Sequence, residues 1–384
     1  MLSREVLDII RATVPVLEKK GVDITARMYE IMVRDFPAVK NYFNPVNFKK
    51  GTQQLTLANA ILAYAKNIER PELFSGMTAT IVQKHCALDI LPEHYPWVGQ
   101  SLLKAIEDVL GSDVATKPVL EAWGAAYFQL ADFLIAAESK EYNRMEASPG
   151  GWRHTREFKV ASKTPQGNNI VTVTLEPVDG KPVYKYEAGQ YMTFKFHFNE
   201  FDQRRHYSLR EKSNGKHYTV SVKLEDDGAV SQYIHNKLNV GDVVELLPPF
   251  GDFVLRKPDP SVPIALLSGG IGITPLLSMG EALMEVENKP EIHFYHWARG
   301  APNFTKEIEN FEKTGFKVKV FDSEKTGHPT AEEIKALVPK NADCYFVGPK
   351  PFMKFMEESL IKAGLPEKNI HYEFYGPTLH FDQI

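Results

Sequence analysis

The first 143 residues carry a helical pattern of apolar positions. From position 2 to position 143, apolar residues recur at spacings of three and four, which places them on one face of a helix. Proline and glycine divide this pattern into blocks, at Gly21, Pro37, Pro71, Pro92 and Gly111. The pattern therefore predicts an all-helical N-terminal part.

The pattern changes near residue 150. The stretch 147–151, Ala-Ser-Pro-Gly-Gly, has the composition of a linker. After it, apolar and polar residues alternate in the segments 170–175, 191–196 and 217–223, which turn residues separate. Such alternation is typical of antiparallel strands, so we expect a β-barrel or a sandwich in this part.

From residue 263 onwards, strand-like apolar segments alternate with helix-like segments. This alternation predicts a parallel, doubly wound sheet with helices on its faces. We find no internal repeat and no low-complexity segment. The predicted elements are, in order, 263–267, 274–286, 291–297, 303–313, 317–321, 331–338, 343–347, 351–363 and 370–374.

Composition narrows the class of protein. The 384 residues suffice for two or three domains, and 43% hydrophobic with 24% charged residues is ordinary for a globular protein. The net charge of −4 forms no basic stripe, so we expect no nucleic-acid partner. Two cysteines, Cys86 and Cys344, suit a reducing compartment. Charges from Arg4 onwards interrupt any signal-peptide pattern, and glycines with Pro275 break the longest apolar run, so we expect a cytoplasmic protein without stable membrane insertion.

A glycine-rich turn stands between the predicted strand 263–267 and the predicted helix that follows it. Glycines let the backbone approach a ligand closely, and the start of a helix attracts anions, so the turn is a candidate phosphate cradle for a dinucleotide. Close packing of the strand on the helix is the alternative, and the spacing differs from the usual G-x-G-x-x-G fingerprint. The turn comprises Ser268, Gly269, Gly270, Ile271, Gly272, Ile273, Thr274 and Pro275.

One histidine in the helical part points along an apolar stripe. Ile81, His85 and Leu88 occupy positions i, i+4 and i+7, so His85 faces the interior. A neutral imidazole in an apolar pocket is a candidate haem-iron ligand. The alternative is a core histidine with one hydrogen bond.

Two polar residues share apolar helix faces. Tyr29 lies with Met32, Val33 and Phe36, and Gln53 lies with Leu57, Ala60 and Ile61. Their hydroxyl and amide groups could stabilise negative charge on oxygen bound at an iron. Bonding to backbone or water at a surface is the alternative.

Over its whole length the chain resembles the flavohaemoglobins. The resemblance implies a globin domain at 1–146, a linker at 147–152, a ferredoxin-reductase-like FAD-binding β-barrel at 153–258 and an NAD(P)H-binding α/β domain at 259–384. The ordered motifs that carry the resemblance are Tyr29, Phe43, Gln53, Leu57, Lys84, His85, Tyr95, Glu138, Gly189, Gln190, Tyr191, Arg205, His206, Tyr207, Ser208, the turn from Gly269 to Pro275, and the tail Tyr372, Glu373, Phe374, Tyr375, Gly376 and Pro377.

For the haem, the resemblance implies that Phe43 presses on the haem face and Leu57 crowds the sixth coordination position of the iron. Glu138 would accept a hydrogen bond from His85, with Tyr95 holding the carboxylate, and Lys84 would lie near the haem–flavin junction. The residues alone favour a different interpretation, because Glu138 lies near a charged helix end, where carboxylates are usually solvated.

For the flavin, Arg205 would hold a phosphate, Tyr207 would face the isoalloxazine ring and Ser208 would lie near its reactive edge. A second anion cradle is expected at Gly228, Val230 and Ser231, at the start of a helix. Phe374 or Tyr375 would cover the flavin until nicotinamide displaces it. Arginine, tyrosine and serine also occur on ordinary exposed strands, and terminal aromatics often only dock a tail.

The chain departs from the family pattern at three positions. Val347 stands where the family has cysteine, Tyr375 where phenylalanine is usual, and Phe48 at a normally polar position. None of the three removes an iron ligand or a flavin anchor. Arg299, after the strand 291–297, suggests a preference for NADPH as a hypothesis.

The resemblance implies an NAD(P)H-dependent nitric oxide dioxygenase. In this oxidoreductase, NO and O₂ become nitrate at the iron of haem b, and electrons reach the iron from NAD(P)H through FAD. O₂, NO and NAD(P)H are the expected partners, and we expect a monomer. Two alternatives stay open: an NAD(P)H-dependent flavin reductase of other acceptors, and an oxygen or NO sensor globin with a domain that keeps its iron reduced.

Overall fold

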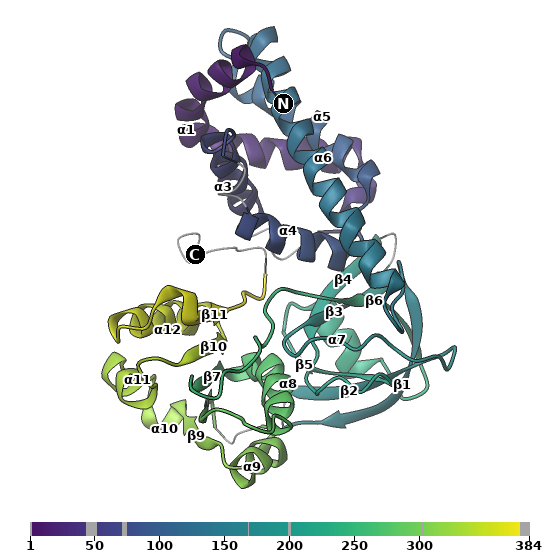
Figure 1. Cartoon of the computed structure of the whole chain (residues 1–384). Coiled ribbons are helices and arrows are strands. Elements are labelled where there is room, and N and C mark those ends of the chain that lie inside the picture. Colours follow the sequence, from purple (N-terminus) through teal and green to yellow (C-terminus); the bar gives the residue numbers. More distant parts are fainter. Residues whose placement is uncertain are drawn as a thin grey trace. The chain divides into compact units, whose positions relative to one another are not determined.

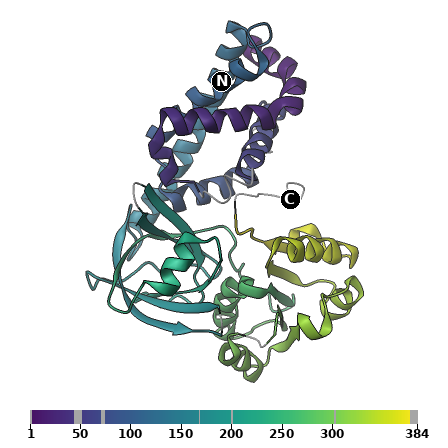
Figure 2. The same cartoon turned by 180° about the vertical axis from the view of Figure 1, so that it is seen from behind.

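The computed structural model describes residues 2–43, 52–70, 75–167, 169–198, 201–300 and 303–376. Contacts divide the chain into two compact units (Figures 1 and 2). The helical unit comprises Met1–Ala147, Lys195–Arg204 and Gly376–Ile384, and the sheet unit comprises Ser148–Phe194 and Arg205–Tyr375.

The N-terminal part of the helical unit is helical throughout its described residues, as predicted. Ser3 begins the first helix, because its side chain accepts a hydrogen bond from the Val6 amide and so satisfies one free N–H group of the first turn. The elements are α1 (Arg4–Asp35), η1 (Pro37–Asn41), α3 (Thr52–Lys66), α4 (Ser75–Leu88), η3 (Pro92–His94), α5 (Tyr95–Leu110) and α6 (Lys117–Ala147).

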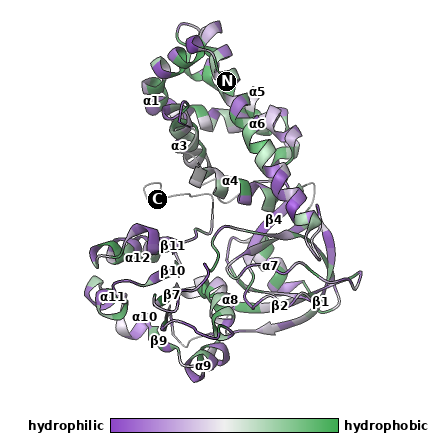
Figure 3. Ribbon diagram, viewed as in Figure 1, coloured by the Kyte–Doolittle hydropathy of each residue, from purple (hydrophilic) through white to green (hydrophobic). Residues whose placement is uncertain are grey.

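The core of this unit forms where α1 packs against α3, α5 and α6. Ile10, Met28 and Ile106 are fully buried there. Trp123 of α6 donates its indole N–H to the Thr13 hydroxyl of α1 at 3.0 Å, so the buried donor has a partner. In Figure 3 these helices carry hydrophobic and hydrophilic colours side by side, the pattern of helices with one buried face.

One predicted helix boundary is wrong. Gly21 does not end a helix, because α1 continues through it and also through Pro15. Ile24, Met28 and Met32 lie on the buried side of the same helix beyond Gly21. Their burial against the other helices outweighs the cost of about 1 kcal/mol for an internal glycine.

Within the described residues, α6 is long and apolar enough to pass a test for a membrane-spanning helix by length and composition alone. Its buried residues include Trp123 and Ala126, which belong to the helical core, and Glu138. A core helix of a globular unit passes the same test, so this finding does not indicate a membrane span.

The first part of the sheet unit is built on a six-stranded sheet. Its order is β4-β3-β6-β1-β2-β5, and the pairs β1–β2, β1–β6 and β2–β5 are antiparallel, as predicted. Strands β1, β4 and β6 were not among the predicted strands. The elements are β1 (Arg156–Pro165), β2 (Ile170–Pro177), β3 (Tyr191–Phe198), β4 (Phe201–Ser208), β5 (Tyr218–Lys223), α7 (Ala229–Asn236) and β6 (Val243–Phe250).

The second part is a parallel five-stranded sheet of order β11-β10-β7-β8-β9, as the alternation predicted. The first strand of this part, β7, therefore lies between β10 and β8, which makes the border of β7 and β10 the topological switch point. The elements are β7 (Ile264–Gly269), η4 (Gly270–Gly272), α8 (Ile273–Met284), β8 (Ile292–Ala298), α9 (Thr305–Lys313), β9 (Lys317–Asp322), α10 (Ser323–Thr326), α11 (Ala331–Leu337), β10 (Asp343–Val347), α12 (Lys350–Lys362), η5 (Glu367–Asn369) and β11 (Ile370–Tyr372).

A buried histidine makes this sheet sensitive to pH. His296 of β8 is 2% exposed, and its Nδ1 lies 2.8 Å from the hydroxyl of Ser268 on β7. Burial lowers the pKa of His296 to about 4. The unfolded chain therefore binds a proton at a higher pH than the folded protein does, and stability falls as the pH drops from about 6.5 towards 4.

We predict that His296→Asn reduces the loss of stability on acidification. The histidine contributes roughly 3 kcal/mol to that loss across the window, because one pKa unit corresponds to about 1.4 kcal/mol. Melting temperatures of both proteins, measured from about pH 7.5 to pH 4.5, test this. Parallel curves for the two proteins would contradict it.

Candidate functional site

His85 lies near the end of α4, where a carboxylate and a hydroxyl meet its ring. Its Nδ1 lies 2.7 Å from Oε1 of Glu138 on α6 and 3.1 Å from the hydroxyl of Tyr95, the first residue of α5. The Tyr95 hydroxyl donates to the same carboxylate oxygen at 2.5 Å. Three helices thus bring these side chains together.

These distances decide which ring nitrogen carries the proton. Tyr95 already donates its hydrogen to Glu138, so the partner that His85 Nδ1 needs is an acceptor. Nδ1–H therefore donates to the Glu138 carboxylate, and in a neutral ring the lone pair then lies on Nε2. A neutral imidazole with Nδ1–H bonded to a carboxylate is the usual state of a metal-binding histidine.

Glu138 is buried, in contrast to the solvated interpretation that its local sequence favoured. Its side chain is 3% exposed. Burial, together with the charge of Glu138, raises the pKa of Tyr95, so this hydroxyl stays a donor at all ordinary pH values. The Tyr127 hydroxyl donates to the Tyr95 backbone carbonyl at 2.7 Å and holds the start of α5.

A largely apolar cavity of about 340 Å³ lies beside His85. Burial raises the pKa of the Tyr29 hydroxyl in its wall, and the Tyr29 ring contacts Phe43 edge to face, with 5.1 Å between ring centroids. Lys84 lines the cavity too, and its ammonium donates to the Gly376 carbonyl at 3.3 Å. The structure thus brings together six predicted residues in this wall, namely Tyr29, Phe43, Leu57, Lys84, His85 and Tyr95.

Two predicted residues of the helical part lie outside the described structure. The side chain of Gln53 and the whole of Phe48 are among the undescribed parts, so their predicted positions stay predictions.

The cavity is also lined by residues that were not predicted to belong to the site. Tyr42, His94 and Trp97 line it, as does Tyr127. Tyr42 and His94 are direct neighbours of the motif residues Phe43 and Tyr95, which was the available signal.

The predicted flavin residues occupy the end of β4. Burial lowers the pKa of the Arg205 guanidinium and raises that of the Tyr207 hydroxyl, whose ring packs edge to face on Phe194 at 5.3 Å. His206 Nδ1 lies 2.7 Å from the Thr193 hydroxyl, and its ring centroid is 4.8 Å from that of Tyr191. Ser208 is buried. Tyr191 therefore contacts His206 of β4.

The second predicted anion cradle lies at the start of a helix, as expected. Gly228 caps the start of α7, as predicted, and Val230 is buried in its first turn. Ser231 turns back, because its hydroxyl donates to the Gly228 carbonyl at 2.9 Å and accepts from the Glu225 amide at 3.2 Å. Backbone N–H groups of the helix start, rather than the Ser231 hydroxyl, are therefore the anion-binding groups available here.

The glycine turn lies at the topological switch point, where doubly wound sheets bind nucleotides. Gly270 has a φ of +54°, which favours glycine. A Cβ on Gly272 would lie 2.3 Å from the Val347 carbonyl oxygen at the end of β10, so only glycine allows this approach. Close packing is thus a property of the turn, and its role as a phosphate cradle stays a prediction. Of its other predicted members, Gly269 ends β7 and Ile271 lies in η4, and Ile273, Thr274 and Pro275 form the first turn of α8.

The C-terminal aromatic residues meet this turn. The Tyr375 hydroxyl lies 3.0 Å from the Ser208 hydroxyl and 3.3 Å from the Thr274 hydroxyl. The hydroxyl that distinguishes Tyr375 from the usual phenylalanine thus joins two predicted cofactor-binding residues. Phe374 is buried, and Pro377 lies outside the described residues.

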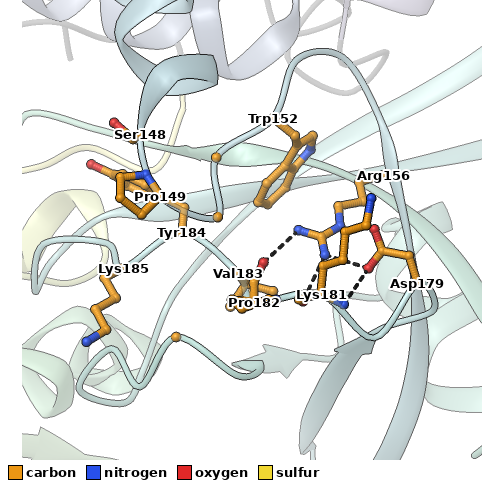
Figure 4. Close-up of a pocket in the computed structure, with 13 residues that line it drawn as sticks. Ser148, Pro149, Trp152, Arg156, Asp179, Lys181, Pro182, Val183, Tyr184 and Lys185 are labelled. Atoms are coloured by element: carbon orange, nitrogen blue, oxygen red, sulfur yellow. Dashed lines mark hydrogen bonds and ion pairs between the residues drawn. The ribbon is translucent and has the colours of Figure 1, made fainter.

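A second hollow, of about 770 Å³, follows the predicted linker (Figure 4). Arg156 donates to the Asp179 carboxylate at 2.6 Å and to the Lys181 carbonyl at 2.9 Å. Gly150 has a φ of +75°, and a Cβ there would lie 2.5 Å from the Val183 carbonyl carbon. These contacts hold the chain in place where it enters the sheet unit. Because the Arg156 guanidinium and the Asp179 carboxylate bond to protein groups, we assign them a structural role.

Fold and site together define a class: a globin joined to an FAD-binding oxidoreductase. A globin family model matches residues 26–134, and a model described as an oxidoreductase FAD-binding domain matches residues 157–255. The flavohemoprotein of Pseudomonas putida is 44% identical over 98% of this chain and 99% of its own length. Flavohemoprotein A of Dictyostelium discoideum is 41% identical over 98% of both chains. The chain belongs to the flavohemoprotein family.

Solved structures agree with this family. A flavohemoglobin from Malassezia yamatoensis with bound FAD and heme superposes with a TM-score of 0.87 at 28% identity, over 98% of this chain and 100% of that one. The FAD/NAD-binding domain of a nitric oxide dioxygenase from Vibrio cholerae gives a TM-score of 0.53 at 30% identity, over 58% of this chain and 98% of that one.

We predict that Tyr95→Phe destabilises the helical unit by about 1–3 kcal/mol, because the buried Glu138 carboxylate loses a donor. Tyr127→Phe is the matched control, since it removes a hydroxyl bonded only to a backbone carbonyl and should cost about 1 kcal/mol. Thermal unfolding followed by circular dichroism compares the two. Equal losses would show that the carboxylate does not depend on Tyr95.

Proposed function

We propose that this chain is a nitric oxide dioxygenase that converts NO and O₂ to nitrate, with electrons from NAD(P)H. The observation that carries the proposal is the hydrogen bonding of His85 to the buried residues Glu138 and Tyr95 beside an apolar cavity. A carboxylate on Nδ1–H makes the Nε2 lone pair a stronger electron donor to a metal. Such donation suits oxygen chemistry at an iron better than reversible oxygen storage.

The cavity fits haem b by its chemistry. Its wall offers one imidazole nitrogen in the correct tautomer, with apolar side chains around it. We assign His85 as the iron ligand, Phe43 as a contact of the haem face and Leu57 as the residue that would crowd the sixth coordination position. When bound, the haem supplies the iron at which NO and O₂ react.

The Tyr29 hydroxyl would act on oxygen from the cavity wall. Because burial raises its pKa, it stays protonated at neutral pH and can donate a hydrogen bond to an oxygen atom that gains negative charge. We assign the same function to the Gln53 amide. Phe43 holds the Tyr29 ring by edge-to-face contact and so limits its orientation.

The sheet unit would bind FAD and NAD(P)H. We assign the end of β4, from Arg205 to Ser208, and the backbone at the start of α7 to FAD, because a partly buried guanidinium and the N–H groups of a helix start both suit phosphate. We assign the turn Gly269–Pro275 to the nicotinamide dinucleotide. Tyr375 with Ser208 and Thr274 would cover the position where nicotinamide meets flavin. When bound, FAD accepts hydride from the nucleotide and releases single electrons.

The direct test is the stoichiometry of nitrate. Protein reconstituted with haem and FAD should oxidise NADH or NADPH with O₂ and NO, and form nitrate in proportion to the NO consumed. The faster nucleotide also tests whether Arg299 favours NADPH. Turnover that is independent of NO and yields no nitrate would instead support a flavin reductase, and binding of NO without turnover would support a sensor.

We predict that Glu138→Gln lowers the NO-dependent turnover by about 10–100-fold, the usual effect of removing a partner of a metal-binding histidine. Glutamine keeps a hydrogen-bond acceptor for His85 Nδ1–H but removes the negative charge. Flavin reduction by NADH in the same protein is the internal control and should keep its rate. Unchanged turnover would contradict the role assigned to the carboxylate.

A further inference from the structure

The end of η1 and the first half of β4 contact each other inside the helical unit. Arg204 donates from Nη1 to the Asn41 backbone carbonyl at 2.7 Å, and the Asp202 amide donates to Asn41 Oδ1 at 2.9 Å. The Arg204 guanidinium also lies over the Tyr42 ring, 4.3 Å from its centroid. The Arg204 side chain is 7% exposed, so the contact is largely shielded from water.

Tyr42, which contacts Arg204, also forms part of the wall of the cavity beside His85. Its ring lines the cavity, and its hydroxyl lies 3.1 Å from Nε2 of His94, a buried residue that also lines the cavity. The Leu91 amide donates to His94 Nδ1 at 3.0 Å, so Nδ1 is the unprotonated nitrogen. His94 Nε2–H therefore donates to the Tyr42 hydroxyl and fixes its orientation.

Burial lowers the pKa of His94, so the ring stays neutral and keeps this tautomer at neutral pH. The charged groups that act on it are Glu93, Asp89, Arg204 and Glu138. Arg204 is thus the cation among these four charged groups. Its guanidinium lies over the ring of Tyr42, whose hydroxyl accepts the hydrogen bond from His94.

We propose that Arg204 is a positioning residue: through Asn41 and Tyr42 it fixes the strand that carries the flavin-binding residues to the wall of the haem cavity. Successive side chains of a strand point to opposite faces. The side chains of Arg204 and Arg205 therefore leave β4 on opposite faces, and the division between the helical unit and the sheet unit falls between these two residues. This inference rests on the proposed passage of electrons from FAD to haem within the chain.

Positioning has a consequence for rate. The transfer of an electron from flavin to haem depends on how the two groups are held, and a small displacement can cost an order of magnitude or more. Loss of the Arg204 side chain removes both the positive charge above the Tyr42 ring and the hydrogen bond to the Asn41 carbonyl. It should therefore slow this transfer and leave the preceding hydride transfer unchanged.

The first experiment measures the contact without any cofactor turnover. Hydrogen–deuterium exchange of the full chain, read in peptides that cover 36–43 and 201–208, should rise in Arg204→Ala and return towards the wild-type level in Arg204→Lys. Lys40→Ala is the matched control, because Lys40 lies 4.8 Å above the Phe201 ring of β4 and does not itself line the cavity beside His85. Equal exchange in wild type and Arg204→Ala would overturn the proposal.

The second experiment separates the two electron-transfer steps. In anaerobic stopped flow with NADH, flavin bleaching reports hydride transfer and the Soret band reports haem reduction. Arg204→Ala should slow haem reduction by about tenfold while flavin bleaching keeps its rate, and Tyr42→Phe in the Arg204→Ala background should add little. Lys40→Ala should behave like wild type. An unchanged rate of haem reduction in Arg204→Ala would overturn the proposal.

Neither experiment contains NO. Failure of the nitrate assay would therefore reject the proposed dioxygenase and leave Arg204 as a positioning residue for haem reduction. Haem reduction at the wild-type rate in Arg204→Ala, with nitrate formation intact, would reject the role of Arg204 alone.

Discussion

The site depends on one hydrogen bond, from His85 Nδ1–H to the buried Glu138 carboxylate. A carboxylate that is 3% exposed is costly unless its oxygens are paired, and Tyr95 and His85 supply the pairing. The three residues come from α4, α5 and α6, so the bond also fixes how these helices meet. Because Nδ1 carries the hydrogen, Nε2 of His85 keeps its lone pair and is the basic nitrogen beside the cavity. The haem chemistry that we propose requires this lone pair as the donor to iron.

A second constraint acts in the sheet unit, where β7 lies between β10 and β8. The strand order puts the glycine turn beside the end of β10, and Gly272 approaches the Val347 carbonyl more closely than any side chain would allow. Strand order therefore explains the glycine, and it puts the turn at the edge where doubly wound sheets usually bind nucleotides. The Tyr375 hydroxyl then links this turn to the end of β4 through Ser208 and Thr274.

The periodic parts of the structure could be predicted from the sequence. Helical spacing before residue 143 and the strand–helix alternation after residue 263 both gave elements of the correct type, because packing follows these periods. Strand β4 was not predicted, because its partly exposed polar residues do not alternate with apolar ones. Strand β6 was not predicted either, because it contains two prolines, which are unusual inside strands. The neighbouring residues in the sequence favoured a solvated Glu138, because the partners that bury it, Tyr95 and His85, are 43 and 53 residues away. Only the family resemblance indicated its burial.

The electron donation from Glu138 through His85 can be measured directly. Resonance Raman spectra of the ferrous, haem-loaded protein report the iron–histidine stretching frequency, which rises when the imidazole gains negative charge from its partner. We predict a higher frequency in the wild-type protein than in Glu138→Gln, with Tyr127→Phe at the wild-type value. The same frequency in wild type and Glu138→Gln would contradict the account, because the carboxylate would then not act on the iron ligand.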